Sequence, residues 1–197
     1  MKGRTSDTVI DPDFLIEAYA NSFFPMADPR TGIISWYSPD PRAVIPLDTF
    51  KVSRSLRQVI QKGVFDVRVD TAYKEVIEAC ALRDETWISK EIIHVYATLH
   101  EKGFAHSVES WLDGHLVGGL YGVAIGGAFF GESMFSKASN ASKVALVHLV
   151  DILRVRGFRL LDTQFMNDHV KQFGAIEIPR SDYRAELANA LQQPAHF

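Results

Sequence analysis

Three polar side chains interrupt apolar stretches of this sequence and carry groups that can hold or move a proton. Glu132 lies in the run from Phe129 to Met134, and Asp162 and Gln164 follow the run from Arg159 to Leu161. Asp162 and Gln164 are two positions apart, so in a β-strand their side chains would share one face. A carboxylate beside a carboxamide can orient an amine nucleophile and accept or relay its proton. A structural network, in which buried acids pair with Arg or Lys, is the alternative interpretation.

A second group of residues could contact phosphates. Lys51, Arg54 and Arg57 recur at three-residue spacing, Lys62 ends the same predicted helix, and no acidic residue lies between Lys51 and Gly63. A basic strip of this kind is typical of a helix that contacts nucleic-acid phosphates. A solvated helix face has the same spacing, so the pattern leaves both interpretations open.

Other kinds of site lack the residues that they would need. The seven histidines form no metal-binding motif and have no cysteine partner, so we expect no metal. Cys80, the single cysteine, is expected in a helix core. Gly131-Glu132-Ser133 lacks the second glycine of a nucleophile elbow, which argues against a serine hydrolase. The formal net charge of −3 argues against a protein that binds nucleic acid over its whole surface.

The hydrophobic pattern predicts the elements that would position these residues. We expect helices from Pro12 and over residues 53–62, 71–82, 89–102 and 140–156. We expect a strand over 64–69, an antiparallel meander over 105–112, 116–125 and 128–134, a strand over 158–163, and finally two short helices with a strand over 175–178. The pattern is typical of an α+β domain in which helices pack on a mostly antiparallel sheet.

The N-terminal part of the sequence has a different character. Five of the eight prolines lie between Phe23 and Pro46, which predicts a stiff loop region joining a small N-terminal domain to the rest. Residues 1–11 are polar and carry both charge signs, unlike a secretion signal. The longest apolar run, residues 116–130, is interrupted by five glycines, so no membrane span is expected. We therefore expect a cytoplasmic protein without a membrane partner.

Eight short motifs in this sequence, in this order, resemble those of the leucyl/phenylalanyl-tRNA–protein transferases over about residues 12–190. They are Trp36-Tyr37-Ser38-Pro39-Asp40-Pro41-Arg42, Thr86-Trp87-Ile88, Ala105-His106-Ser107-Val108-Glu109, Gly118-Gly119-Leu120-Tyr121-Gly122, Gly131-Glu132-Ser133-Met134-Phe135-Ser136, Asn140-Ala141-Ser142-Lys143, Leu161-Asp162-Thr163-Gln164 and Asn167-Asp168-His169. The resemblance implies a small N-terminal domain over residues 1–42 and a catalytic domain over 43–197 with an acetyltransferase-like (GNAT-type) fold.

The resemblance also implies a reaction. The free α-amine of a protein that begins with Arg or Lys would attack the ester carbonyl joining Leu or Phe to tRNA, with some leakage to Met. The product would be marked for degradation by the N-degron pathway. The substrates would be leucyl-tRNA and phenylalanyl-tRNA with the acceptor protein; we expect no further cofactor, no DNA and a monomer.

Site residues follow from the same resemblance, position by position. Asp162 and Gln164 match the catalytic pair, and Glu132 matches an active-site acid that holds the basic acceptor. The residues that match the aminoacyl side-chain pocket are Leu120, Phe129, Leu146, Leu149, Leu153 and Leu161. Those that match the contacts to the tRNA 3′ adenosine are Trp87 and Met26, and those that match the contacts to the acceptor stem are Arg54, Arg57 and Lys62.

This sequence departs from the family pattern at two places. Met26 stands where an aromatic residue is common, and Ser6 to Ile10 replace a glycine-rich segment. Two other functions would use parts of the same pattern. An acetyl-CoA-dependent N-acetyltransferase would need a glycine loop opening the helix after Ser139, which is absent. A non-catalytic RNA-binding module would have no need of Glu132, Asp162 and Gln164.

Overall fold

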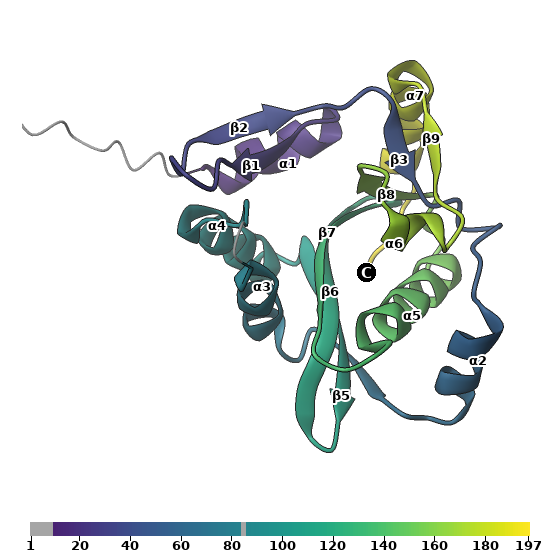
Figure 1. Cartoon of the computed structure of the whole chain (residues 1–197). Coiled ribbons are helices and arrows are strands. Elements are labelled where there is room, and N and C mark those ends of the chain that lie inside the picture. The colour runs from purple at the N-terminus through teal and green to yellow at the C-terminus, as the bar shows by residue number, and fades with distance from the viewer. Residues whose placement is uncertain (1–9, 84–85) are drawn as a thin grey trace, which may run out of the picture.

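The protein is seen in a computed structural model that describes residues 10–83 and 86–197. A small N-terminal unit lies across one end of a large twisted sheet, and helices cover both faces of that sheet (Figure 1). The helices are α1 (Pro12–Ala20), α2 (Arg54–Gln61), α3 (Tyr73–Ala81), α4 (Lys90–Glu101), α5 (Ala141–Val155), α6 (Asp168–Lys171) and α7 (Arg180–Leu191). The strands are β1 (Phe24–Ala27), β2 (Ile34–Tyr37), β3 (Arg42–Val44), β4 (Asp66–Val69), β5 (Ala105–Leu112), β6 (His115–Ile125), β7 (Ala128–Ser136), β8 (Leu160–Gln164) and β9 (Ile176–Ile178).

The helix ends follow from capping residues in the sequence. Asp11 accepts a hydrogen bond from the Asp13 amide at the start of α1, with Pro12 at the first helical position. Ser53 and Ser89 cap α2 and α4 in the same way. The expected helices are therefore confirmed, with ends displaced by one or two residues.

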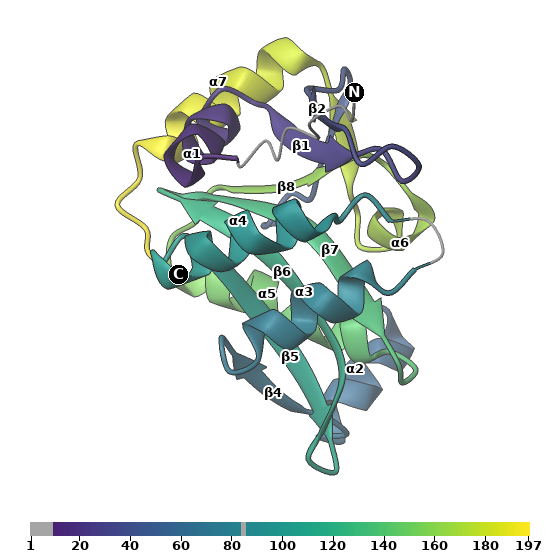
Figure 2. The ribbon, with the colours of Figure 1, turned by 90° about the vertical axis from the view of Figure 1, so that its left-hand side faces the viewer.

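The large sheet has the strand order β4-β5-β6-β7-β8-β3-β9. Every neighbouring pair is antiparallel except β7 and β8, which confirms the mostly antiparallel α+β architecture. The β5–β6 turn places Asp113 and Gly114 at φ +50° and +76°, the left-handed conformation that a type I′ hairpin requires. Figure 2 shows the three long strands of this meander running behind α3 and α4.

The prediction of a stiff loop between Phe23 and Pro46 is wrong, because β1, β2 and β3 all lie in that segment. Pro25 is tolerated because β1 and β2 form a two-stranded sheet in which both strands are edges, so its missing amide need not break a ladder. β3 joins the large sheet between β8 and β9. The last helix is also longer than expected, with twelve residues in α7.

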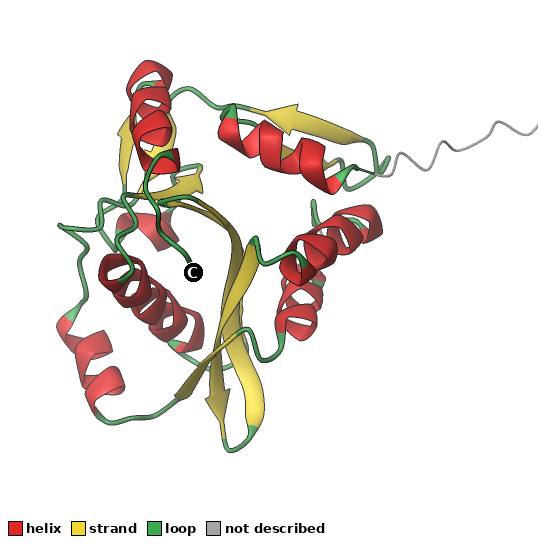
Figure 3. Ribbon diagram, turned by 180° about the vertical axis from the view of Figure 1, so that it is seen from behind, coloured by secondary structure: helices red, strands yellow, loops and turns green. Residues whose placement is uncertain are grey.

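Two buried clusters hold the layers together. Figure 3 shows the helices on the two sides of the sheet against which these clusters pack. One includes residues of α1, α3 and α4, and the other is built around the apolar face of α5. Cys80 is buried in the first cluster, as expected, and burial raises the pKa of its thiol to about 12.

Some expectations fall on parts of the chain that the structure does not describe. Residues 1–9, with most of the polar N-terminal segment and of the Ser6 to Ile10 departure, lie outside the described residues. Across the part that is described, the longest and most apolar helices fall short of what a bilayer crossing requires.

The parallel pair β7 and β8 separates after a short paired stretch. The paired residues are Ala128 with Leu160, Phe129 with Leu161 and Phe130 with Asp162. β7 then continues to Ser136 while β8 ends at Gln164. This separation leaves space beside the second half of β7, where Glu132 lies.

Candidate active site

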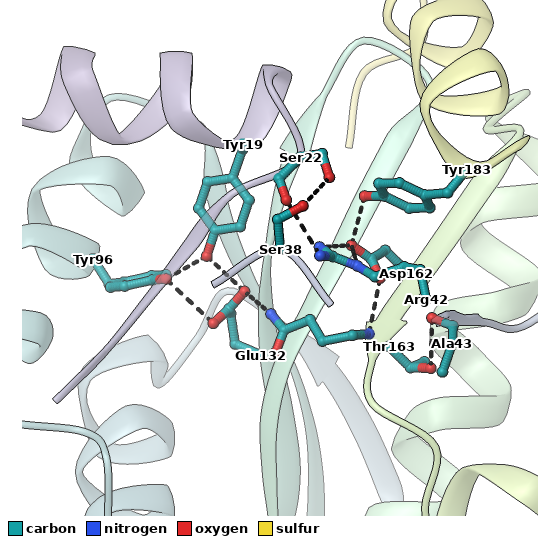
Figure 4. Close-up of polar contacts among 11 residues, drawn as sticks. Tyr19, Ser22, Ser38, Arg42, Ala43, Tyr96, Glu132, Asp162, Thr163 and Tyr183 are labelled. Atoms are coloured by element: carbon teal, nitrogen blue, oxygen red, sulfur yellow. Dashed lines mark hydrogen bonds and ion pairs between the residues drawn. The ribbon is translucent and has the colours of Figure 1, made fainter. Parts of the chain in front are cut away.

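Glu132 occupies a β-bulge in β7. Tyr121 pairs with Ser133 and Gly122 pairs with Gly131, so Glu132 is the extra residue on its strand. A bulge frees a residue from the ladder and re-aims its side chain, and such bulges are common beside active sites. Glu132 points between the N-terminal unit and the sheet, toward two tyrosines from other elements (Figure 4).

Uncharged hydrogen-bond donors surround the Glu132 carboxylate. Tyr19 of α1 donates to Oε1 over 2.6 Å, Tyr96 of α4 donates to Oε2 over 3.2 Å, and Gln164 Nε2 donates to Oε1 over 2.8 Å. The two tyrosine hydroxyls also contact each other. Burial raises the Glu132 pKa to about 7, while the bonds from Tyr19 and Tyr96 oppose this rise. The group therefore exchanges its proton near neutral pH.

Asp162 has a different environment, although it lies only one strand away. Its carboxylate forms a buried ion pair with Arg42, with Nη2 2.6 Å and Nε 3.0 Å from its oxygens, and it accepts the Tyr183 hydroxyl over 2.7 Å. Arg42 itself lies against the rings of Phe24 and Tyr183. Asp162 is fully buried. The structural network that the sequence left open is thus present at this residue.

Gln164 connects the two acids. Its φ of +65° is unusual for a residue other than glycine, and its amide donates to Asp162 Oδ1 over 2.8 Å. The Asp162 carboxylate binds Arg42 and the Gln164 carboxamide binds Glu132, so the two side chains have different partners within one polar network. Left-handed backbone conformations like that of Gln164 cost of order 1–3 kcal/mol and cluster at functional sites.

A cavity of about 660 Å³ opens beside Glu132, between the separated ends of β7 and β8. Glu132 lies on its wall, together with four of the predicted pocket leucines: Leu120, Leu146, Leu149 and Leu161. The apolar wall continues with three residues that the sequence analysis did not select: Ile45, Met134 and Val170.

Two predicted pocket residues, Phe129 and Leu153, do not line this cavity. Both are fully buried in the cluster behind the leucine wall. A Cβ added at Gly122 would lie 2.5 Å from the Phe129 ring, so that ring packs on the sheet. Their place on pocket-forming elements was predicted, but the direction of their side chains was not.

The predicted tRNA contacts are not among the residues that line this cavity. The amide of Ala27, next to Met26, donates to the Trp87 carbonyl over 3.1 Å, so these two candidate residues for the adenosine meet at one place. Both are partly buried, and neither lines the cavity. Arg54, Arg57 and Lys62 are exposed on and beside α2. Within residues 10–83 and 86–197, no cluster of His, Cys, Asp or Glu could hold a metal ion.

Four residues of the site were missed by the sequence analysis: Tyr19, Arg42, Tyr96 and Tyr183. Tyr19 and Tyr96 lie on the apolar faces of amphipathic helices, where a tyrosine looks like a core residue. Arg42 is in a recognised motif, but nothing in the sequence connects it to Asp162, 120 positions later. A basic residue directly before an apolar stretch, Ala43-Val44-Ile45, was the available signal.

Comparison with known proteins agrees with the motifs. The family model described as leucyl/phenylalanyl-tRNA protein transferase matches residues 44–188, and the model of its N-terminal domain matches residues 9–40. The leucyl/phenylalanyl-tRNA–protein transferase of Gloeobacter violaceus is 56% identical over 188 residues, which are 95% of this chain and 97% of that protein. That of Herpetosiphon aurantiacus is 56% identical over 189 residues, which are 95% and 98% of the two chains.

One solved structure, of L-PGS from Bacillus licheniformis, aligns over 79% of this chain and 51% of its own. The sequence identity is 13% and the TM-score is 0.43. That likeness is too weak to support any statement about function.

Proposed function

Because the chain belongs to the leucyl/phenylalanyl-tRNA–protein transferase family, and so is an aminoacyltransferase, we propose that it moves Leu or Phe to proteins that begin with Arg or Lys. One observation carries the proposal: a single cavity combines a leucine-lined wall with one partly buried carboxylate, Glu132. The proposal includes a monomer acting in the cytoplasm, without a cofactor, whose products enter the N-degron pathway.

The leucine wall suits the side chain of the donor amino acid. Leu120, Leu146, Leu149 and Leu161 offer apolar contact without a hydrogen-bonding group. A pocket of this kind selects by fit, and one methylene changes the binding free energy by only about 1–3 kcal/mol. We therefore expect transfer of Leu and Phe with measurable transfer of Met.

Glu132 suits the basic residue of the acceptor. Its carboxylate is held by Tyr19, Tyr96 and Gln164, none of which neutralises its charge. With a pKa of about 7, a large fraction is ionised near neutral pH. A cationic Arg or Lys side chain would supply the missing counter-charge, whereas an acceptor that begins with Gly would not.

Gln164 does not itself line the cavity, but it binds the cavity-lining Glu132 and would orient the reacting amine from there. Its Nε2 is occupied by Glu132, which leaves its side-chain oxygen to accept an N–H of the amine. The amine nitrogen then forms a bond to the ester carbonyl carbon, the bond to the ribose oxygen breaks, and that oxygen takes up the proton. Asp162 contributes as a positioning residue, because its carboxylate fixes the strained Gln164 backbone.

The remaining family assignments are part of the same proposal. Trp87 and Met26 would contact the terminal adenosine, and Arg54, Arg57 and Lys62 the acceptor-stem phosphates, which carry no sequence information. The parallel pair β7 and β8 supports the acetyltransferase-like fold. The two strands separate beside the cavity, and α5 connects β7 to β8 along the chain.

The test is transfer of radiolabelled Leu from leucyl-tRNA to a model protein beginning with Arg, beside the same protein beginning with Gly. We expect label on the Arg protein and none on the Gly protein, and parallel reactions should show transfer to a Lys protein and from phenylalanyl-tRNA. Equal labelling of the Arg and Gly proteins would refute the acceptor assignment. Binding of leucyl-tRNA without transfer would instead indicate an RNA-binding module.

A further inference from the structure

Three lysines lie between α2 and the cavity, and we call them the lysine track: Lys51, Lys143 and Lys137. Lys51 directly precedes α2, and its amide donates to the Phe173 carbonyl over 2.9 Å. A Cβ placed on Gly174 would lie 3.4 Å from the Lys51 side chain. Lys51 therefore connects the basic helix α2 to the segment between α6 and β9.

Lys143 lies near the same segment and close to the cavity. It is in the first turn of α5, and its Nζ donates to Gln172 Oε1 over 2.8 Å, at the end of α6. His169, also in α6, lines the cavity. Burial lowers the His169 pKa, and the nearby Lys143 ammonium lowers it further. The positive charge of Lys143 therefore acts on His169 in the wall of the cavity.

Lys137 lies at the mouth of the cavity, which it helps to line. It is five residues beyond Glu132, which corresponds to about 16 Å along an extended strand. The cavity therefore has a carboxylate and an exposed ammonium at separate places. This separation suits a site that must receive a cationic protein terminus and an anionic RNA end together.

The charges of the lysine track are not neutralised by the protein. Within the described chain, none of the ion pairs involves Lys51, Lys137 or Lys143. The partner of Lys143 is a neutral amide, and the Lys137 ammonium lies over the Phe135 ring. By contrast, Lys102 and Lys74 each approach a carboxylate.

We propose that the lysine track binds the backbone phosphates of the unpaired tRNA 3′ end, between the stem on α2 and the aminoacyl group in the cavity. The inference rests on the proposed function, because that function places the two ends of the acceptor arm at α2 and at the leucine wall. A chain of nucleotides joining these places must cross the surface that carries the track. Phosphate contacts are independent of base sequence, as an enzyme with more than one donor tRNA requires.

The experiment compares K137Q, K143Q and their double variant with the wild type, using two donors. Leucyl-tRNA carries the phosphates, and leucyl-adenosine carries the same ester without them. We expect each single change to weaken leucyl-tRNA binding several-fold and to lower the slope of log affinity against log salt by about one, and the double change by about two. Transfer from leucyl-adenosine should fall much less than transfer from leucyl-tRNA in each variant.

K74Q, on α3 at the opposite face of the sheet, is the matched control and should bind leucyl-tRNA like the wild type. Equal losses with both donors would overturn the proposal, since they would place the lysines in the ester site or the fold. Unchanged tRNA affinity, or a loss that does not depend on salt, would also overturn it. If the wild type bound tRNA but transferred nothing, the proposed function would fail, while the binding measurements would still decide on the track.

Discussion

Glu132 and Asp162 are two acids that interrupt neighbouring apolar strands, yet the structure gives them opposite surroundings. Asp162 has no exposed surface and is neutralised by the Arg42 guanidinium, with Tyr183 and the Gln164 amide completing its hydrogen bonds. Glu132 lies at a bulge on the wall of the cavity and has only uncharged donors. One acid is neutralised by the fold, and the other lies at the cavity wall without an ion-pair partner.

The difference shows how one polar network can hold a neutralised acid beside one that has no cation as a partner. A buried carboxylate is costly unless a cation pairs with it, and Arg42 provides that cation at Asp162. At Glu132 the same cost is only partly offset, which appears as a pKa of about 7. Gln164 binds both acids, so the ion-paired Asp162 helps to fix the position of Gln164 and, through it, of Glu132.

Removing the cation should have the largest effect. Arg42→Met leaves Asp162 buried without its counter-charge, and we expect a loss of about 3–5 kcal/mol in the free energy of unfolding. Urea denaturation followed by circular dichroism measures it. Adding Asp162→Asn should restore much of the loss, because the uncompensated charge is then gone. If the free energy of unfolding of Arg42→Met lay within about 1 kcal/mol of the wild-type value, the contrast between the two acids would be contradicted.

Neutralising the other acid should affect activity rather than stability. Glu132→Gln keeps the shape of the side chain but removes the charge offered to the acceptor, so kcat/KM for a protein beginning with Arg should fall on the order of a hundredfold. The free energy of unfolding should stay the same or rise, since no partly buried charge remains. Loss of stability like that of Arg42→Met would contradict this prediction; affinity for leucyl-tRNA is the control.

A smaller effect is expected when the stronger tyrosine bond to Glu132 is removed. Tyr19→Phe deletes a 2.6 Å bond that favours the ionised carboxylate, so the Glu132 pKa should rise from about 7. A carboxyl with a higher pKa is ionised only at higher pH. The KM for the Arg protein should fall as the pH rises and Glu132 ionises. The midpoint of this fall, measured between about pH 6 and 9, should therefore lie at a higher pH in Tyr19→Phe than in the wild type. An unchanged midpoint would show that another group governs acceptor binding.

The smallest shift is expected for Tyr96→Phe, because the Tyr96 bond to Glu132 is longer, at 3.2 Å. The midpoint should move in the same direction as in Tyr19→Phe but by less. Tyr73→Phe is the matched control, since the Tyr73 hydroxyl is buried without a hydrogen-bond partner in the described structure. If Tyr73→Phe moved the midpoint as far as Tyr96→Phe did, the shift would reflect packing around the site.

Local signals in the sequence determined most of the secondary structure. Contacts within a few residues fix where a helix begins or where the chain reverses. The helix starts are capped by Asp11, Ser53 and Ser89, and the reversal is the turn at Asp113-Gly114. The three short strands near the prolines were not predicted. β1 and β2 pair with each other despite Pro25, whereas β3 pairs with β8 and β9, more than a hundred residues later. Formation of β3 depends on partners that no local pattern shows.

The sequence by itself determined which residues could do chemistry at this site: the motifs identified Glu132, Asp162, Gln164 and the leucines. The tertiary structure alone decided which acid is neutralised, because Arg42 and Tyr19 reach these strands from segments far away in the chain. It also decided that Phe129 and Leu153 pack behind the cavity wall. Charge compensation and burial depend on distances across the fold, and residue spacing along one strand or helix does not contain them.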